Sequence, residues 1–338
     1  MLTVNDFQTL LRAQKEQNIP WEEFTTLFGI PLQTKAEDYF AHWQTSKQNL
    51  TFHTSGSTGT PKYITHSVAA LLQEIESLFP HFKNKLEQAL VCVPIHHLYG
   101  FSFGFLLPKV LDIPIKYISL PTELADQINA HTLVVGMPLI FRALLNLSPS
   151  LPFFQAITGT SPMDNTTWEK LKNNASVLEI FGSTETSVLA TRTDFNAPYT
   201  LLPHFSRKNA QSVQRTLPGG TLSTYNLQDR LQWLTDTTFL PQGRLDFALQ
   251  VAGVNVYPQK VAAYLLTHPK ISACAIRLMH QTMRLKAFLV LKDAEPTVEF
   301  RRELRAFIKS GLSPAEQPIQ FDFGLELPKN RMGKLCDW

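Results

Sequence analysis

The sequence has few cysteines, and their spacing excludes two kinds of stabilising cross-link. Its 338 residues include three cysteines, Cys92, Cys274 and Cys336, which lie far apart and form no CxxC pair. Three widely spaced thiols fit neither a disulfide scaffold nor a structural zinc site. The cysteine content therefore indicates a reducing compartment.

The sequence also has little net charge and no long apolar run. The 31 basic and 28 acidic residues leave a scattered excess of +3, so nucleic acid is not expected as a partner. The first residues carry Asp6 and lack the apolar core of a signal peptide. No membrane span is expected, because the most apolar stretch, residues 98–118, is interrupted by Pro108, Lys109, Asp112 and Pro114. We expect a soluble, cytoplasmic protein.

The overall composition is typical of a folded chain with more than one domain. Hydrophobic residues make up 44% of the sequence and charged residues 17%, which excludes a disordered chain. A chain of 338 residues suits one large domain and a smaller one. The sequence contains no internal repeat and no low-complexity segment.

Residues 50–190 have the pattern of a layered α/β domain, because short apolar runs alternate with helical periodicity. Ser67 is predicted to cap one helix, and a second is predicted to start after Asp164. Residues 195–242 are predicted to be irregular, with a turn at Pro218-Gly219-Gly220. Strands are predicted at residues 50–53, 90–94, 133–135, 156–158 and 177–181.

The pattern changes near Asp246, where we place the domain boundary. The remaining chain of roughly ninety residues has a normal size for a small α+β domain. The sequence thus predicts an N-terminal domain over residues 1–245 and a C-terminal domain over residues 246–338. In the latter, helices are predicted at residues 258–267 and 297–310, and strands at 272–279, 286–292 and 319–323.

The most informative segment is a loop rich in glycine and hydroxyl groups that follows a predicted strand. It has the sequence Thr54-Ser55-Gly56-Ser57-Thr58-Gly59-Thr60-Pro61-Lys62. Glycines let several main-chain N–H groups converge on an anion, and lysine adds a flexible positive charge suited to phosphate. The spacing matches neither GxxxxGK[ST] nor GxGxxG. A flexible surface loop is the alternative interpretation.

This loop resembles the phosphate loop of the adenylate-forming (AMP-binding) superfamily, which includes acyl- and aryl-CoA synthetases, adenylation domains of peptide synthetases, and luciferases. The resemblance implies a large layered α/β N-terminal domain and a small, mobile α+β C-terminal lid domain. It also implies that ATP is bound by Thr54, Ser55, Gly56, Ser57, Thr58, Gly59 and Lys62.

Two further segments resemble the nucleotide site of that family. The segment Phe181-Gly182-Ser183-Thr184-Glu185 resembles its aromatic-Gly-Ser-Thr-Glu motif. By resemblance, Thr184 binds the α-phosphate and Glu185 holds Mg²⁺, a hard cation that prefers carboxylate oxygen. Gly159-Thr160-Ser161 occupies the place of the turn beside the adenine. Ordinary turns at strand ends are the alternative for both.

The motifs nearer the C-terminus follow in the family's order. Thr235-Asp236 resembles a Thr-Gly-Asp motif without its glycine and implies that Asp236 binds the ribose, the alternative being a surface turn. Gly243-Arg244-Leu245-Asp246 matches Gly-Arg-x-Asp, which implies a ribose contact for Arg244 and a hinge at Asp246. Residues 327–334 resemble Leu-Pro-x-x-x-x-Gly-Lys, so Lys334 is implied to act in adenylation. A frayed basic tail is the alternative.

Two adjacent histidines, His96 and His97, follow a predicted strand. Neighbouring side chains point in different directions, so they do not form a chelating pair. The segment resembles the family's His-x-Tyr/Phe-Gly, and we expect His97 to line the pocket for the carboxylic acid. A histidine satisfied at a strand end is the alternative.

Two departures from the family pattern affect the prediction. The phosphate loop starts after only 53 residues, so we expect a missing or minimal N-terminal subdomain, as in compact bacterial ligases of aromatic or quinone-precursor acids. A homodimer covering the exposed flank is one hypothesis. Many members also carry a lysine where this chain has Gln250, before the segment implied in thioester formation.

The resemblance implies an enzyme, an AMP-forming acid–thiol ligase. A small carboxylic acid, aromatic or short acyl, would attack Mg·ATP to give acyl-adenylate and pyrophosphate, and a thiol would displace AMP. The thiol is coenzyme A or, alternatively, the phosphopantetheine of an acyl carrier protein, for which Arg301, Arg302 and Arg305 offer a basic patch. A rival of another class is a non-catalytic nucleotide-binding relic.

Overall fold

The computed structural model describes residues 4–19, 49–54, 62–82, 85–245, 248–251, 254–279, 282–292, 296–328, 336 and 338. The chain divides into two compact units, Met1–Gly243 and Arg244–Trp338. The predicted roles of the two domains, a shortened nucleotide-binding domain and a mobile lid domain, stay predictions.

The described part of the first unit is built on a nine-stranded mixed sheet with the order β13-β14-β9-β8-β7-β6-β5-β3-β4. The ladder from β4 to β7 is parallel, and β8, β9 and β14 continue it with antiparallel pairing. The strands are β3 (Gln88–Val91), β4 (Ile115–Tyr117), β5 (Thr132–Gly136), β6 (Phe154–Thr158), β7 (Ala175–Ser183), β8 (Ser187–Arg192), β9 (Tyr199–Leu201), β13 (Asp229–Trp233) and β14 (Thr238–Arg244).

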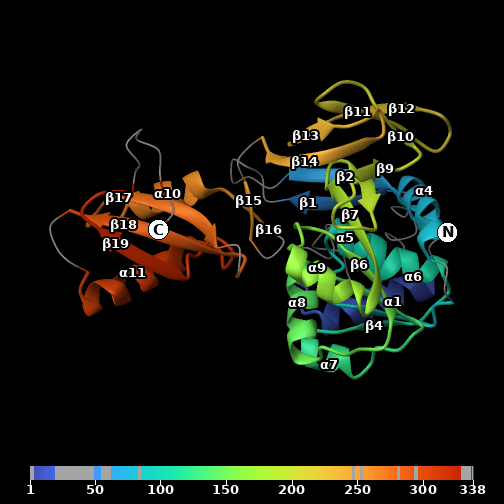
Figure 1. Ribbon diagram of the computed structural model, residues 1–338, viewed down its shortest axis with the longest axis horizontal. Coiled ribbons are helices and arrows are strands. Elements are labelled where there is room, and N and C mark those ends of the chain that lie inside the picture. Colours follow the sequence, from blue (N-terminus) through green and yellow to red (C-terminus); the bar gives the residue numbers. More distant parts are fainter. Residues whose placement is uncertain are drawn as a thin grey trace. The chain divides into compact units, whose positions relative to one another are not determined.

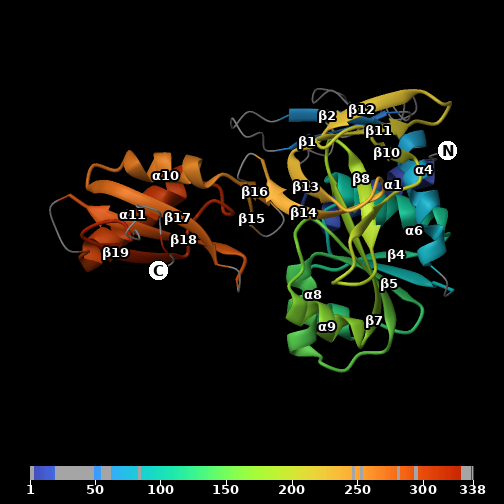
Figure 2. The same cartoon turned by 45° about the horizontal axis from the view of Figure 1, so that its top comes forward.

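Helices cover both faces of the parallel ladder. Side chains alternate across each strand, so Val91 and Val135 enter one apolar cluster while Leu90 and Val134 enter another. The first cluster packs under α1 (Val4–Glu16), α4 (Val68–Leu78), α5 (Leu98–Phe101), the π-helical turn η3 (Ser102–Leu106) and α6 (Leu107–Val110). The second packs under α7 (Pro121–Ala125), α8 (Pro138–Leu147) and α9 (Asn165–Lys172), and Figures 1 and 2 show α8 and α9 together, away from α4 and α6. The predicted layered α/β fold is confirmed.

The predicted helix caps are also confirmed. The Ser67 hydroxyl accepts a hydrogen bond from the Ala70 N–H at 3.1 Å, and Asp164 accepts one from the Thr167 N–H at 2.9 Å. Each cap satisfies a main-chain donor that the first helical turn leaves unpaired. The short 3-10 turn η2 (Phe79–His81) follows α4.

Residues 195–242 form ordered strands, so the prediction of an irregular region was wrong. Besides β9, β13 and β14, this region forms a three-stranded sheet of β10 (Phe205–Arg207), β11 (Ser212–Thr216) and β12 (Leu222–Asn226). Its strands are short and partly exposed, so alternation of apolar residues does not reveal them. The predicted turn between β11 and β12 is present, with φ of 91° at Gly219 and 86° at Gly220.

The described residues of the second unit form an α+β fold, as predicted. Its three-stranded sheet has the order β17-β18-β19 and packs against two helices over a core that includes Val261, Leu289 and Leu304. A small hairpin, β15 (Leu249–Val251) and β16 (Val254–Val256), precedes them. The other elements are α10 (Pro258–Leu266), β17 (Ile271–Met279), β18 (Arg284–Leu291), α11 (Val298–Gly311) and β19 (Gln320–Gly324).

Candidate functional site

The carboxyl ends of neighbouring parallel strands bring several predicted site residues to one edge of the sheet. His97 follows β3, Gly159 to Ser161 follow β6, and Thr184 and Glu185 follow β7. In open α/β sheets this edge is where ligands bind, because loops after parallel strands emerge side by side. This edge is therefore the candidate functional site.

The turn between β7 and β8 carries Thr184 and Glu185, which are both half-buried. Its backbone is tight: a β-carbon on Gly182 would collide with the carbonyl oxygen of Ser187, so only glycine fits there. Ser187 itself has φ of 58°, a left-handed conformation that is unfavourable for a residue with a side chain. The ring of Phe181 packs against Tyr199 and Phe239, both with centroids 5.3 Å away.

The second part of the site is the hairpin of β1 (Asn49–Thr54) and β2 (Lys62–Ser67). Six residue pairs align the two strands, and Thr54 lies directly opposite Lys62. The two ends of the predicted phosphate loop are thus adjacent, and the Lys62 side chain is exposed. Ser55, Gly56, Ser57, Thr58 and Gly59 lie outside the described residues.

The predicted pocket residue His97 is exposed and caps α5 through its main chain. Its ring centroid lies 4.0 Å from that of His96, so the expectation that the two side chains point in different directions was wrong. Helix α1 anchors this segment, because Gln17 donates to Val93 O at 2.9 Å and accepts from Ile95 N at 3.0 Å. In the turn after β6, Gly159 is buried, whereas Thr160 is exposed with φ of 69°.

Four predicted residues lie further along the chain. Asp236 sits in the turn between β13 and β14, with its side chain 94% exposed and 3.5 Å from Arg207. Antiparallel pairing of β14 with β9 puts this turn at the same sheet edge as the β7–β8 turn. Arg244 ends β14, after Gly243 with φ of 93°. The predicted hinge Asp246 and the predicted catalytic Lys334 lie outside the described residues.

Sequence reasoning missed a buried polar network beneath the β7–β8 turn. Glu74 on α4 is 1% exposed and Arg215 on β11 is 0% exposed, and an Arg215 N–H donates to Glu74 Oε1 at 2.5 Å. The other Glu74 oxygen accepts from the Ser187 hydroxyl at 2.6 Å and from Val188 N at 3.4 Å. One signal was available: Glu74 falls on the apolar stripe of its helix, between Leu71 and Leu78.

Two further residues at the site were missed. His66 on β2 is 6% exposed, and its Nε2 lies 2.6 Å from the carbonyl oxygen of Thr184. The Tyr99 hydroxyl lies within hydrogen-bond distance of two main-chain carbonyl oxygens, Gly136 O of β5 at 2.8 Å and Ile157 O of β6 at 3.0 Å, and its single proton is shared between them. Burial raises the pKa of Tyr99 well above its ordinary range.

The free energy of unfolding should depend on pH because of the buried carboxyl group of Glu74. Burial raises its pKa to about 7, although Arg215 and Ser187 act in the opposite direction. The folded protein therefore binds this proton more tightly than the unfolded chain, and the resulting stabilisation is lost as the pH rises through 7. We expect the wild type to lose unfolding free energy relative to Glu74→Gln between about pH 5 and about pH 8. Urea unfolding of both proteins measures this, and a constant difference would contradict it.

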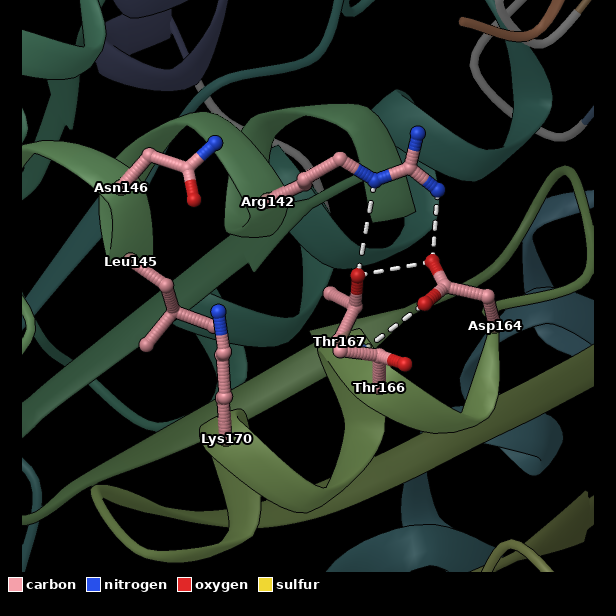
Figure 3. A pocket seen from close by; sticks show the side chains of 7 residues that line it. All are labelled: Arg142, Leu145, Asn146, Asp164, Thr166, Thr167 and Lys170. Atoms are coloured by element: carbon pink, nitrogen blue, oxygen red, sulfur yellow. Dashed lines mark hydrogen bonds and ion pairs between the residues drawn. The ribbon is translucent and has the colours of Figure 1, made fainter. Parts of the chain in front are cut away.

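A depression between α8 and α9 lies on the helical face that covers the second apolar cluster (Figure 3). Its centre is an Asp164 carboxylate that accepts from the Arg142 guanidinium at 2.5 Å and the Thr167 hydroxyl at 2.7 Å. These bonds outweigh partial burial and lower the pKa of Asp164 to about 2. The cluster completes a helix cap and joins two helices, and it is not part of the candidate site.

Two features, a cluster of metal ligands and a membrane-spanning helix, are absent from the part of the chain that the structure describes. Among the described residues, no group of three or more His, Cys, Asp or Glu side chains is placed to hold a metal ion. Among the same residues, no helix combines the length and the apolar character needed to cross a membrane.

Comparison with known sequences identifies the class of this protein. The sequence model of the family "AMP-binding enzyme" matches residues 19–220, and that of "AMP-binding enzyme C-terminal domain" matches residues 260–334. The 4-coumarate–CoA ligase of Halorhodospira halophila is 36% identical over 293 residues, covering 85% of this chain and 74% of the relative. The 4-coumarate–CoA ligase of Rhodobacter capsulatus is 34% identical over 304 residues, covering 85% and 74%.

Solved structures show the same fold. The o-succinylbenzoate CoA synthetase of Bacillus subtilis aligns with a TM-score of 0.66 and 18% identity, over 85% of this chain and 67% of the other. The amide bond synthetase of Marinactinospora thermotolerans aligns with a TM-score of 0.66 and 19% identity, over 84% and 67%.

The chain belongs to the AMP-binding enzyme family, as its motifs predict. Within that family it is an AMP-forming acid–thiol ligase of the acyl- and aryl-CoA synthetase type.

Proposed function

We propose that this enzyme activates an aromatic acid of the hydroxycinnamate class. The chain activates a carboxylic acid with ATP to an acyl-adenylate and then forms the thioester with coenzyme A. The aromatic preference is supported by one observation: three 4-coumarate–CoA ligases are 34–36% identical over 85–86% of this chain.

In the proposed mechanism the acid's carboxylate oxygen attacks the α-phosphorus of ATP, and the bond from that phosphorus to pyrophosphate breaks. The thiolate of the acceptor then attacks the acyl carbon and AMP leaves. Such transfers depend on positioning and on neutralising charge. We assign the pyrophosphate to the Thr54–Lys62 loop, the α-phosphate to Thr184 and the acid's carboxylate to His97.

The remaining roles follow the family motifs. We assign the adenine to the Gly159–Ser161 turn and the ribose to Asp236 and Arg244. Residues 246–338 are proposed to act as a lid that turns about Asp246 and brings Lys334 to the reacting groups in the first step. In that step a lysine would stabilise the negative charge that develops on the carboxylate and phosphate oxygens.

The residues at the β7–β8 turn fit a magnesium ion. The half-buried Glu185 supplies a hard carboxylate oxygen, and no larger group of metal ligands accompanies it among the described residues. Mg²⁺ is commonly bound by one or two carboxylates together with substrate phosphates. We propose that Glu185 holds the Mg²⁺, which when bound neutralises phosphate charge.

Glu185→Gln tests this assignment. The variant keeps the shape of the side chain but removes the negative charge, so adenylation should fall about 10²-fold, the scale of losing one preorganised electrostatic contact. Added Mg²⁺ should restore part of the rate. Initial rates of pyrophosphate release over a Mg²⁺ titration measure this. Glu169→Gln is the control, because Glu169 lies on the exposed side of α9. Glu179→Gln is unsuitable, because Glu179 is buried against Arg192. A rate equal to that of Glu169→Gln would contradict the assignment.

Two finer proposals concern assembly and location. We propose a cytoplasmic enzyme, supported by three free cysteines, Cys92, Cys274 and Cys336. We also propose a homodimer, a hypothesis that a monomeric mass in solution would exclude.

The decisive experiment is acid-dependent pyrophosphate release from Mg·ATP across benzoic, cinnamic, succinylbenzoic, short-chain and medium-chain acids. Turnover that requires coenzyme A and is fastest with cinnamic acids would support the proposal. A single burst with coenzyme A inert would indicate a carrier protein, for which the exposed Arg301, Arg302 and Arg305 of α11 offer a surface. ATP binding without release for any acid would favour the relic.

A further inference from the structure

One continuous segment of chain holds the β7–β8 turn at both ends. This segment, β2 and α4, begins at Lys62, where the predicted phosphate loop ends, and extends to Leu78. His66 contacts the turn at Thr184, and Glu74 contacts it at Ser187. The two parts of the candidate nucleotide site, far apart in sequence, are therefore joined by side chains of a single segment.

The contact of His66 has a defined direction. A carbonyl oxygen can only accept, so Nε2 carries the proton and donates to Thr184 O across 2.6 Å. The ring is 6% exposed and lies beside Phe52, with centroids 6.3 Å apart. Burial lowers the pKa of His66, against the raising effect of the Thr184 hydrogen bond.

The contact of Glu74 fixes the other end. It accepts the Ser187 hydroxyl and the Val188 N–H, and thereby holds Ser187 in its left-handed conformation. Arg215 neutralises the carboxylate and also donates to Ala70 O of α4 at 2.6 Å. Glu74 thus fixes the end of the turn at Ser187. At the other end, the Thr184 carbonyl oxygen is held by a side chain from outside the turn, that of His66.

We propose that His66 is a positioning residue for nucleotide binding: its Nε2–H fixes the Thr184–Glu185 peptide relative to the hairpin that carries the phosphate loop. The inference rests on the proposed function, in which Thr184 and Glu185 bind the α-phosphate and Mg²⁺. Without this hydrogen bond the peptide can rotate, and the side chains of Thr184 and Glu185 lose their fixed position relative to the β1–β2 hairpin. A role in stability alone would leave nucleotide affinity unchanged in the folded enzyme.

Three substitutions separate these roles. His66→Leu removes the donor, His66→Asn keeps an amide too short to reach Thr184 O, and His66→Gln places an amide N–H near the position of Nε2. We expect the Leu and Asn variants to raise the KM for Mg·ATP by about 5- to 10-fold, the scale of one buried hydrogen bond. The KM for the acid and thioester formation from supplied acyl-adenylate should stay unchanged. His66→Gln should restore the KM for Mg·ATP to within about twofold of wild type.

A matched control comes from another histidine. His204 is half-buried near Arg215, and its pKa is lowered to about 4 by burial, but its ring packs at a tilt against Phe205, with centroids 5.0 Å apart. His204→Leu should leave the KM for Mg·ATP unchanged. An unchanged KM in folded His66→Leu or His66→Asn, an equal loss in both half-reactions, or no rescue by His66→Gln would overturn the inference.

The same assay distinguishes the inference from the proposed function. If Glu185→Gln leaves Mg·ATP binding and turnover intact, the assignment of the nucleotide site itself is wrong. If Glu185→Gln impairs them while the His66 variants match His204→Leu, only the positioning role fails. Should His66→Leu fail to fold, the comparison of His66→Asn with His66→Gln still decides the outcome.

Discussion

Lys334→Ala should slow acyl-adenylate formation by about 10²–10³-fold, the range for losing one preorganised electrostatic contact at developing charge. Thioester formation from supplied acyl-adenylate should change little, because the proposed lid turns between the two steps and Lys334 is assigned to the first. Single-turnover pyrophosphate release and thioester formation, measured separately, provide the two rates.

Lys329→Ala is the matched control, since it removes one positive charge from the same segment. If the segment were only a basic tail, both alanine variants would behave alike. Equal loss of both half-reactions in Lys334→Ala would contradict the assignment of this lysine to adenylation and, with it, the proposed lid motion.

Arg215→Met should lower the unfolding free energy by about 3–5 kcal/mol, because it leaves the Glu74 carboxylate buried without its partner. The pair is 0% and 1% exposed, so water cannot replace the lost guanidinium. Urea or guanidinium unfolding at about pH 8, where Glu74 is ionised, measures the effect.

Two variants control this measurement. Asp236→Asn breaks the pair with Arg207, in which Asp236 is 94% exposed, and should cost less than about 1 kcal/mol. The double variant Glu74→Leu/Arg215→Met should recover part of the loss, because no unpaired charge stays buried, while the Ser187 hydroxyl and the Val188 N–H lose their acceptor. A single-variant loss no larger than that of Asp236→Asn would contradict the predicted cost.

The sequence predicted those parts of the fold that local patterns encode. Ser67 and Asp164 were identified as helix starts because a cap depends on residues within one turn. The strands after residue 195 were missed because they are stabilised by distant partners: Thr238 of β14 pairs with Thr200 of β9. β9 alternates over only three residues, too few to mark a strand, and β14 shows no sustained alternation.

The candidate site divides in the same way. Its motifs lie in short segments and were found by resemblance, and the order of strands explains why His97, Gly159 and Thr184 reach one edge of the sheet. The position of Glu74 on the apolar face of α4 indicates burial, but the partners in the supporting network were not predictable, because each of its bonds joins distant residues. Glu74 and Arg215 are 141 positions apart, and His66 and Thr184 are 118 apart.

Strand pairing fixes the two residues between which the loop of the β1–β2 hairpin runs, so the loop can be replaced as a unit. Thr54 and Lys62 face each other across the ladder, and five further residue pairs hold the register below them. A graft of different composition between these two residues can therefore inherit the same anchoring points. The proposed phosphate recognition and the folding of the hairpin are in this sense separable, and loops from other ligases can be compared on one common frame.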